Sequence, residues 1–331
     1  MQDDMRIEPV DFIVPGDRMS GLYAADRADP GPGPRMSFRH FQVVIEHGWS
    51  DERSEAWVAR RSGEIAGGYA LHYPQSDNTH LALIRVLAVH PDHRRNGVGG
   101  ALLRHAIERA RAEGRRVILG EAAADRPGAA FAAAFGFSPA ATEARRVLDL
   151  RTADWSGFEL MRGDAVRHAR DYQLERWAGP VGEEQLGEMA ELMSGMNDEP
   201  LGDLDIENQR WDPARVRAHD QSTVAAGLRA YTMVARHTGT GEPAGFTRIA
   251  VDAHEPEGWA RQHETAVLRP HRGRRLGLIL KLANLAWFHA CEPSVERVVT
   301  WNSTSNSHML GINEKLGYQV LDLWNEWQLR V

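Results

Sequence analysis

Two segments of the chain combine arginine and glycine at a spacing that can bind a diphosphate. The first runs Arg94-Arg95-Asn96-Gly97-Val98-Gly99 and is followed by Gly100. Glycines allow a tight turn and let the main chain approach a ligand closely. Where a helix begins in such a loop, its first N–H groups are unpaired and its dipole adds partial positive charge. This junction is therefore an anion cradle suited to a diphosphate, with arginine charges at its rim.

The second segment, Arg272-Gly273-Arg274-Arg275-Leu276-Gly277, lies 178 residues further along. Identical residues recur at this offset: Ala88, Val89, His93, Arg94, Gly99 and Leu102 match Ala266, Val267, His271, Arg272, Gly277 and Leu280. A repeat of this length has the size of a domain and exceeds that of a solenoid unit. In the second copy Arg275 replaces the first glycine, which counts against tight diphosphate binding, although the loop stays very basic.

The elements that position the two loops follow the same order in both copies, β-β-β-loop-α-β-α-β. In the first copy the expected strands are 55–61, 65–73, 83–89 and 117–122, with a helix at 99–112. In the second copy they are 230–236, 244–251, 264–268 and 295–300, with a helix at 278–290. Further helices are expected at 181–196 and 213–228, the latter capped by Asp212. Gly136 and Gly317 stand where helices end.

Other phosphate-binding motifs fit the loops less well. A Walker A motif requires Gly-Lys-Ser/Thr, which is missing here. A dinucleotide fingerprint would use Glu121, about 20 residues further on, but the glycine spacing differs and two antiparallel-looking strands precede the loop. The remaining alternative is a glycine-containing helix start with solvated arginines. The strand before, the helix after and the second copy make it the less favoured interpretation.

At these residues the sequence resembles the GCN5-related N-acetyltransferase (GNAT) family in a tandem, mycothiol-synthase-like arrangement. The family signature, Gln/Arg-x-x-Gly-x-Gly/Ala, binds the diphosphate of coenzyme A through its backbone. The resemblance implies an α/β (α+β) fold with two GNAT-type domains, each a mixed, mostly antiparallel sheet flanked by helices. We expect an N-terminal domain over residues 1–150, a polar linker over 151–168 and a C-terminal domain over 169–331.

The resemblance also implies which residues bind acetyl-CoA. The strand before each loop would splay from its neighbour, pair its backbone with the pantetheine arm and polarise the thioester oxygen. The implied coenzyme-binding residues are Leu87, Ala88, Val89, Arg94, Arg95, Asn96, Gly97, Val98, Gly99, Gly100, Ala266, Val267, Arg272, Gly273, Arg274, Arg275, Leu276 and Gly277. Asn302 and Asn306 are candidates for hydrogen bonds to the arm, with helix capping and turn formation as the alternative.

Direct attack by an amine on the thioester benefits from a general base. Family members often place a carboxylate on the strand before the loop, and this position is Glu264 in the second copy but Val86 in the first. A solvated edge residue is the alternative role for Glu264. The family's usual tyrosine acid, four residues before the helix-ending glycine, is replaced by Ala132 and Asn313. The first copy thus has the better coenzyme loop and the second the better base, and which half is catalytic stays open.

Composition narrows the function further. The net charge of −7 does not favour nucleic acid as a partner, and the single cysteine, Cys291, excludes an internal disulfide and a Cys-rich zinc site. The histidines show no metal-ligand spacing and no apolar run reaches membrane-spanning length. We therefore expect a cytoplasmic, acetyl-CoA-dependent N-acetyltransferase without a metal, acting on a primary amine of a small molecule. Acidic residues in 197–207 are candidates for binding the ammonium group.

Two alternatives remain at this stage. One is a non-catalytic coenzyme-A-binding or structural tandem module, favoured by the missing tyrosines and opposed by Glu264. The other is a protein or peptide N-acetyltransferase, which would need an open acceptor groove. The acceptor, the acyl-chain preference and the oligomeric state are not predicted by the residues.

Overall fold

The computed structural model describes residues 5–29, 31–48, 52–255 and 257–331. These residues divide into two compact units, which are described separately. Unit 1 comprises residues up to Ala141 together with Asp203–Asn208 and Trp324–Val331. Unit 2 comprises Thr142–Gly202 and Gln209–Leu323. The sequence predicted domains continuous along the chain, whereas each unit here contains segments from both halves of the sequence.

Unit 1 is built on a mixed sheet with the strand order β1-β2-β3-β4-β5, followed by the last residues of β12. All of its recorded strand pairs are antiparallel except β4 with β5. The strands are β1 (Met5–Pro9), β2 (Arg53–Arg61), β3 (Glu64–Tyr73), β4 (Leu81–Val89), β5 (Val117–Ala123) and β12 (Gln319–Arg330). The helices are α1 (Gly16–Arg27), α2 (Phe38–His47), α3 (Val98–Ala112) and α4 (Pro127–Ala134).

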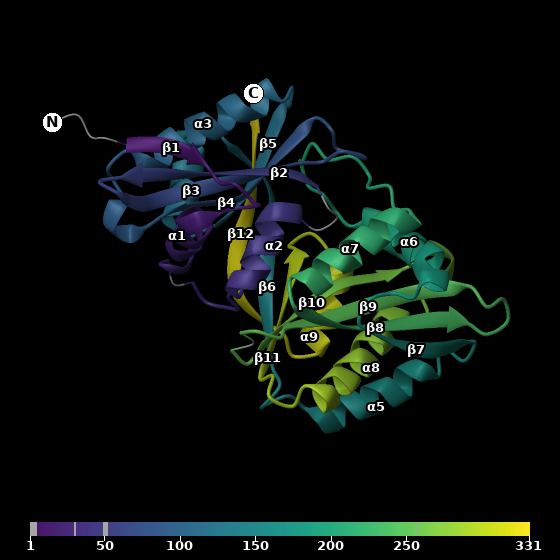
Figure 1. The fold of residues 1–331 in the computed structure, drawn as a ribbon. Coiled ribbons are helices and arrows are strands. Elements are labelled where there is room, and N and C mark those ends of the chain that lie inside the picture. Colours follow the sequence, from purple (N-terminus) through teal and green to yellow (C-terminus); the bar gives the residue numbers. More distant parts are fainter. Residues whose placement is uncertain (1–4, 30, 49–51, 256) are drawn as a thin grey trace. The chain divides into compact units, whose positions relative to one another are not determined.

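Successive side chains of β3 point to opposite faces of this sheet, as the twofold period of a strand requires. Ala70 belongs to the core formed with α1 and α2, which bury Leu22 and Phe41. Its neighbours Tyr69 and Leu71 belong to the core on the other face, which α3 covers. In Figure 1 these elements carry the purple and blue colours of the N-terminal sequence. Helix α3 is thereby fixed against the sheet, with its N-terminus at the end of β4.

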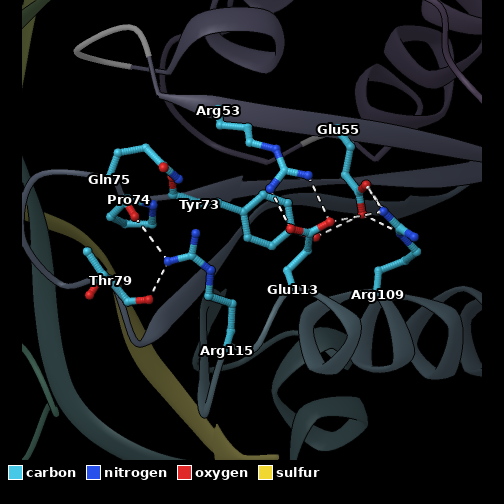
Figure 2. A network of polar contacts seen from close by, with 9 residues as sticks. All are labelled: Arg53, Glu55, Tyr73, Pro74, Gln75, Thr79, Arg109, Glu113 and Arg115. Carbon is cyan, nitrogen blue, oxygen red and sulfur yellow. Dashed lines mark hydrogen bonds and ion pairs between the residues drawn. The ribbon is translucent and has the colours of Figure 1, made fainter.

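A polar network anchors α3 to the strands of unit 1 (Figure 2). The Arg109 guanidinium donates from Nη2 to Glu55 Oε2 at 2.7 Å, and the Tyr73 hydroxyl donates to Glu55 Oε1 at 2.8 Å. Arg53 forms an ion pair with Glu113, directly after α3. Arg115 Nη1 donates to the carbonyl of Pro74 at 3.0 Å. The network holds the C-terminal end of α3, which leaves its N-terminal end available to the arginine–glycine loop.

Unit 2 repeats the plan with the strand order β6-β11-β10-β9-β8-β7. Here β10 and β11 are parallel, whereas the other recorded pairs are antiparallel. The strands are β6 (Ser138–Asp149), β7 (Tyr172–Ala178), β8 (Leu228–His237), β9 (Pro243–Asp252), β10 (Trp259–Val267) and β11 (Arg297–Ser303). The helices are α5 (Trp155–Val166), α6 (Leu186–Ser194), α7 (Pro213–Ala225), α8 (Leu276–Cys291) and α9 (Ser307–Lys315). Both sheets thus confirm the predicted fold class.

Helices α8 and α5 cover one face of this sheet, and α6 and α7 cover the other (Figure 1). Phe246 of β9 packs on the α6 side with Met189, whereas Ile249 packs on the α8 side with Leu282. The predicted helix at 181–196 forms as α6 with short 3-10 turns on either side. The predicted Asp212 cap of α7 is confirmed, because its Oδ1 accepts the backbone N–H of Arg215 at 2.8 Å.

The last strand of each half of the sequence pairs with a strand of the unit that is formed mainly by the other half. Residues Glu143–Asp149 of β6 pair with β11 in unit 2. Residues Trp324–Arg330 of β12 pair with β5 in unit 1. The segment 151–168, expected to be a linker, instead contains α5, which buries Phe158 and Ala165 in the core of unit 2. The polar composition of this segment concealed its few apolar residues at helical spacing.

Candidate functional site

The two arginine–glycine loops have the same backbone conformation. Each connects a strand, through one turn of 3-10 helix, to the helix that follows. The first position with positive φ is Arg95 in unit 1 (φ 62°) and Gly273 in unit 2 (φ 79°). The second, directly before the helix, is Gly97 (φ 80°) and Arg275 (φ 58°). Replacing Gly97 by Arg275 therefore preserves the loop geometry, and the helix N-terminus is presented in both units.

The first arginine of each loop is tied back to its strand. Arg94 Nε donates to the carbonyl of Val89 at 3.0 Å, and Arg272 Nε donates to the carbonyl of Val267 at 2.9 Å. The outer nitrogens form ion pairs, Arg94 with Asp29 at 2.9 Å and Arg272 with Asp198 at 2.5 Å. These arginines hold the loop closed over the strand end, so the backbone N–H groups remain the principal anion donors.

The strand before each loop separates from its parallel neighbour, as expected. In unit 1 the recorded β4–β5 pairs end at Ile84 with Gly120. In unit 2 the recorded β10–β11 pairs end at Arg261 with Val299. Beyond these points the described strands diverge, which exposes one backbone edge of β4 and of β10. Such an edge can pair with an extended ligand arm.

Unit 2 contains a cavity of about 1080 Å³ between this diverging edge and the N-terminus of α8. The predicted site residues that line it are Glu264, Ala266, Val267, Arg272, Gly273, Arg275, Leu276, Gly277, Asn302 and Asn306. Arg274 is not among the lining residues: its guanidinium lies over the Tyr172 ring, 5.9 Å from the centroid. The structure therefore brings the predicted base and the coenzyme loop of the second copy into one cavity.

The predicted residues of the first copy lie in unit 1. Leu87, Ala88 and Val89 form the diverging end of β4. Residues 94–100 form the loop and the first turn of α3. The two predicted sets thus belong to two separate units, and each has its own strand–loop–helix junction.

Glu264 lies inside β10, five residues after the strand begins at Trp259. The pairing of β10 with β9 is interrupted between Gln262 and Thr265, so His263 and Glu264 form a bulge. Bulges redirect side chains and are common beside active sites. The Glu264 Oε2 atom is buried and accepts no hydrogen bond from the described protein atoms. The alternative of a solvated strand-edge residue is therefore wrong.

The electrostatic surroundings keep the Glu264 carboxyl ionised. Burial alone would raise its pKa, but the positive charges of His263, His219 and Arg248 outweigh burial and hold the pKa below the ordinary 4.5. Burial lowers the pKa of His263 to about 4, so this imidazole is uncharged at neutral pH. Arg248 is buried, donates to Thr232 at 3.0 Å and pairs with Asp220 at 3.2 Å. Glu264 is thus available as a proton acceptor at neutral pH.

The two predicted asparagines have different environments. Asn306 caps α9, since its Oδ1 accepts the Met309 N–H at 3.2 Å, which confirms the capping alternative for this residue. Asn302 lies in β11, and its Oδ1 accepts from Asn313 Nδ2 at 2.6 Å. Asn302 and Asn313 are both buried. They form an amide pair at the wall of the cavity where the family pattern would place the tyrosine.

The acidic segment 197–207 is divided between the two units. Asp198 and Glu199 line the cavity of unit 2. Asp205 and Glu207 belong to unit 1, where the Glu207 N–H donates to Asn78 Oδ1 at 2.6 Å and Arg330 pairs with Asp205 at 3.0 Å. Asp198 pairs with Arg269 and Arg272, which lowers its pKa to about 2. The local charge pattern could not show that part of this loop packs against unit 1.

Two further ionisable residues line the cavity. Glu199, from the acidic segment 197–207 singled out in the sequence, lies in the wall and is hydrogen-bonded to Asn306, and burial raises its pKa. Lys281, which the sequence reasoning missed, lines the cavity from the buried face of α8. A lysine at a position where the helix period requires an apolar residue was the available signal for Lys281.

When the strand registers of the two units are aligned, several polar residues of unit 2 correspond to apolar residues of unit 1. Glu264 corresponds to Val86, Lys281 to Leu103 and Asn302 to Ala122. Asn313 corresponds to Ala132, four residues before the helix-ending glycine. Both units therefore have the arginine–glycine loop, but at these four positions the polar side chains, including the ionisable Glu264 and Lys281, belong to unit 2.

The described residues contain no cluster of three or more histidine, cysteine or acidic side chains arranged to bind a metal ion. None of their helices combines the length and the apolar character needed to cross a membrane.

Comparison with known proteins agrees with this geometry. Residues 22–137 match the family described as the acetyltransferase (GNAT) family. No curated protein matches the chain. Among solved structures, a tandem GNAT protein from the clavulanic acid biosynthesis pathway is 26% identical, with a TM-score of 0.80 over 99% of this chain and 98% of that one.

Two further structures share the fold at lower identity. A GCN5-related N-acetyltransferase from Sphaerobacter thermophilus is 14% identical, with a TM-score of 0.64 over 100% of this chain and 96% of that one. A glucosamine N-acetyltransferase region of a fungal multi-domain GH3 β-N-acetylglucosaminidase is 14% identical, with a TM-score of 0.68 over 99% of this chain and 38% of that one.

The fold and the two loops are those of an acetyltransferase of the GNAT type. Residues 22–137 match the acetyltransferase (GNAT) family, whose reaction is acetyl transfer from acetyl-coenzyme A to an acceptor, and the chain is similar over its whole length to a tandem GNAT protein.

Proposed function

We propose that the chain acetylates a primary amine of a small molecule and that the chemistry takes place in the cavity of unit 2. This cavity is close to the upper end of the usual 300–1,000 Å³ of small-molecule sites, so it has room for the arm of acetyl-CoA and a small acceptor. It is lined by the second coenzyme loop and by Glu264. The observation that carries the proposal is the presence of this carboxylate beside the loop in unit 2 and of Val86 in its place in unit 1.

Coenzyme binding would use groups that the structure presents. The backbone N–H groups at Leu276–Gly277 and the charge of Arg275 suit the diphosphate. The free edge of β10 around Ala266 and Val267 suits the amides of the pantetheine arm. Acetyl-CoA supplies the activated acetyl group, and the backbone of the same edge can donate a hydrogen bond to the thioester oxygen.

Glu264 is assigned the role of general base. An amine that attacks a carbonyl carbon becomes positively charged and must lose a proton, and the ionised Oε2 in the cavity wall can accept it. Glu199, in the same wall, suits an interaction with the ammonium form of the acceptor before attack. The roles of both carboxylates rest on their position in the cavity and on their charge.

A matched pair of loop variants tests the assignment of the reaction to unit 2. Gly277→Glu places a carboxylate in the loop of unit 2, and Gly99→Glu places one at the equivalent position of unit 1. Isothermal titration with coenzyme A measures binding, and thiol release from acetyl-CoA with a panel of small primary amines measures turnover. We expect G277E to abolish turnover and G99E to retain it. Turnover that survives G277E but not G99E would place the chemistry in unit 1.

A further inference from the structure

Lys281 is an unusual residue for its position. The chain has 39 lysine and arginine residues, and only Lys281 and Lys315 are lysines. Lys281 is 2% exposed, whereas Lys315 is exposed at the end of α9. The equivalent of Lys281 in unit 1 is the buried Leu103. A fully buried lysine is rare unless it is paired, because burial penalises the charged form.

The recorded neighbours of the Lys281 ammonium carry no negative charge. Its Nζ lies 4.0 Å from the Met309 sulfur and 5.7 Å from the centroid of the Tyr318 ring. Among the described residues, no ion pair to Lys281 is recorded, although acidic and basic side chains line the same cavity: Glu143, Asp164, Asp198, Glu199, Glu264, Arg272, Arg275, His308 and Lys315. Burial lowers its pKa to about 7. The amine can therefore gain or lose a proton near neutral pH.

The transfer reaction itself creates an anion that a proton donor could neutralise. When the amine nitrogen bonds to the acetyl carbon, the carbon–sulfur bond breaks and its electron pair goes to the sulfur of coenzyme A. The resulting thiolate is a better leaving group when a neighbouring acid donates a proton to it. This charge arises inside the cavity whatever the acceptor is.

Other groups in or near the wall are poorer donors for this proton. Asn313, at the position of the family's tyrosine, carries an amide, and its Nδ2 already donates to Asn302. His263 is uncharged at neutral pH because burial lowers its pKa to about 4. Tyr318 is buried, which raises the pKa of its phenol. Glu199, hydrogen-bonded to the cap of α9, and His308 are the alternatives in the wall.

We propose that Lys281 is the proton donor to the leaving thiolate of coenzyme A, acting from the buried face of α8 in place of the missing tyrosine. The ammonium gives one proton to the sulfur as the carbon–sulfur bond breaks, and Glu264 takes one proton from the attacking nitrogen. Solvent then restores the Lys281 proton and removes the one on Glu264, so that charge and protons balance over the cycle. This inference rests on the proposed function in unit 2.

Because the chain has two lysines, isotopic labelling with [¹³Cε]lysine gives two side-chain signals, and the Lys281 signal is assigned by its absence from the Lys281→Met variant. We expect Lys281 to titrate near pH 7. Coenzyme A should shift the midpoint of Lys281, because its sulfur lies beside the amine and the two groups titrate as a coupled pair. Desulfo-coenzyme A, which lacks only the sulfur, should leave the midpoint close to that of the free protein. Equal effects of the two compounds would overturn the proposal.

Kinetics separates a proton donor from a packing residue. Thiol release from acetyl-CoA is measured with hydroxylamine, a small amine that is unprotonated at neutral pH. We expect Lys281→Met to lower kcat by about 10²-fold or more at an unchanged affinity for coenzyme A. The wild-type rate should fall as pH rises through about 7, where the donor loses its proton, and K281M should lack this decline. Leu103→Met in unit 1 is the matched control and should leave the rate unchanged.

The outcomes also distinguish this proposal from the proposed function. If Gly277→Glu does not affect coenzyme A binding, the assignment of the coenzyme to unit 2 fails, and the role of Lys281 fails with it. If G277E abolishes binding and turnover but K281M keeps the wild-type rate and pH profile, only the role of Lys281 is overturned. If Glu199→Gln removes the decline with pH and K281M does not, the donor is Glu199.

Discussion

Gly97 and Arg275 hold the same left-handed backbone conformation at the residue that precedes α3 and α8. Gly97 has φ 80° and ψ −7°, and Arg275 has φ 58° and ψ 17°. No atom lies within 4 Å of the position that a Cβ at Gly97 would occupy, so space is not the reason for glycine there. A side chain at this position is disfavoured by the left-handed backbone conformation. Unit 2 has a side chain there, and Arg275 adds a positive charge to its loop.

Arg275→Gly should therefore stabilise unit 2 and weaken coenzyme binding. A residue with a Cβ pays roughly 1 kcal/mol or more in this conformation, and glycine does not. The ion pair of Arg275 with Asp164 is exposed and adds little to stability. Urea unfolding checks the first effect and calorimetric titration with coenzyme A the second. Gly97→Ala is the converse control and should destabilise unit 1; a loss of stability in R275G would show that strain is not the dominant effect.

The second prediction concerns the pH range in which Glu264 works. The pKa of Glu264 is held below 4.5, so the carboxylate is ionised throughout neutral and mildly acidic pH. A general base acts in its deprotonated form, so its contribution should persist as pH falls to about 5 and be lost only below the folded pKa. Glu264→Gln should lower kcat by about 10²-fold or more without weakening coenzyme binding.

The matched control for this variant is Val86→Ala at the equivalent position of unit 1, which should retain turnover. The rate is followed by thiol release with a neutral amine, so that the titration of the acceptor does not mask that of the base. An E264Q variant with the wild-type rate would remove Glu264 from the mechanism.

The fold could be predicted from the sequence to a large extent, because its two copies support each other. The hydrophobic periods and the arginine–glycine loops locate β2–β5, α3 and their counterparts β8–β11 and α8 to within a few residues. The main exception is Glu264, which was expected at the start of a strand. The residues Trp259–His263 alternate in burial, but Arg261, Gln262 and His263 are all polar, so no alternation of polar and apolar types marked the start of the strand.

The partition of the chain into units could not be predicted locally. The sequence pattern indicates that β12 is the last strand of the second copy. Nothing in Trp324–Arg330 shows that these residues pair with β5. The position of Lys281 in the cavity wall likewise depends on α9 and Tyr318, which are distant in sequence. Strand exchange and side-chain burial are decided by long-range packing, which single-sequence patterns do not encode.

The third prediction concerns the buried ion pair that supports the site. Asp220 accepts the Val181 N–H at 2.7 Å and lies 3.2 Å from Arg248, and both charged residues are buried. Asp220→Asn leaves the Arg248 charge without a compensating carboxylate, so we expect a loss of about 3–5 kcal/mol in the free energy of unfolding. Chemical denaturation measures this loss.

The exposed pair of Arg217 with Glu183 in the same unit is the control. Glu183→Gln should change stability very little, because solvent screens this pair. Similar losses in D220N and E183Q would contradict the argument that burial decides the cost.

The last prediction tests the role of β12 in unit 1. Trp327 is 7% exposed and packs in the core that includes Leu102 and Phe137 of unit 1, although it lies four residues from the C-terminus. Trp327→Ala should destabilise unit 1 by about 3–5 kcal/mol, as for other large-to-small changes in a core. Leu323→Ala, at a 43% exposed position of the same strand, is the control and should have little effect.

Because the proposed catalytic residues belong to unit 2, W327A should still release thiol from acetyl-CoA at temperatures where unit 1 is unfolded. Hydrogen exchange by mass spectrometry follows β5 and α3 separately from β10 and α8, and loss of protection in all four elements together would show that the two units unfold as one.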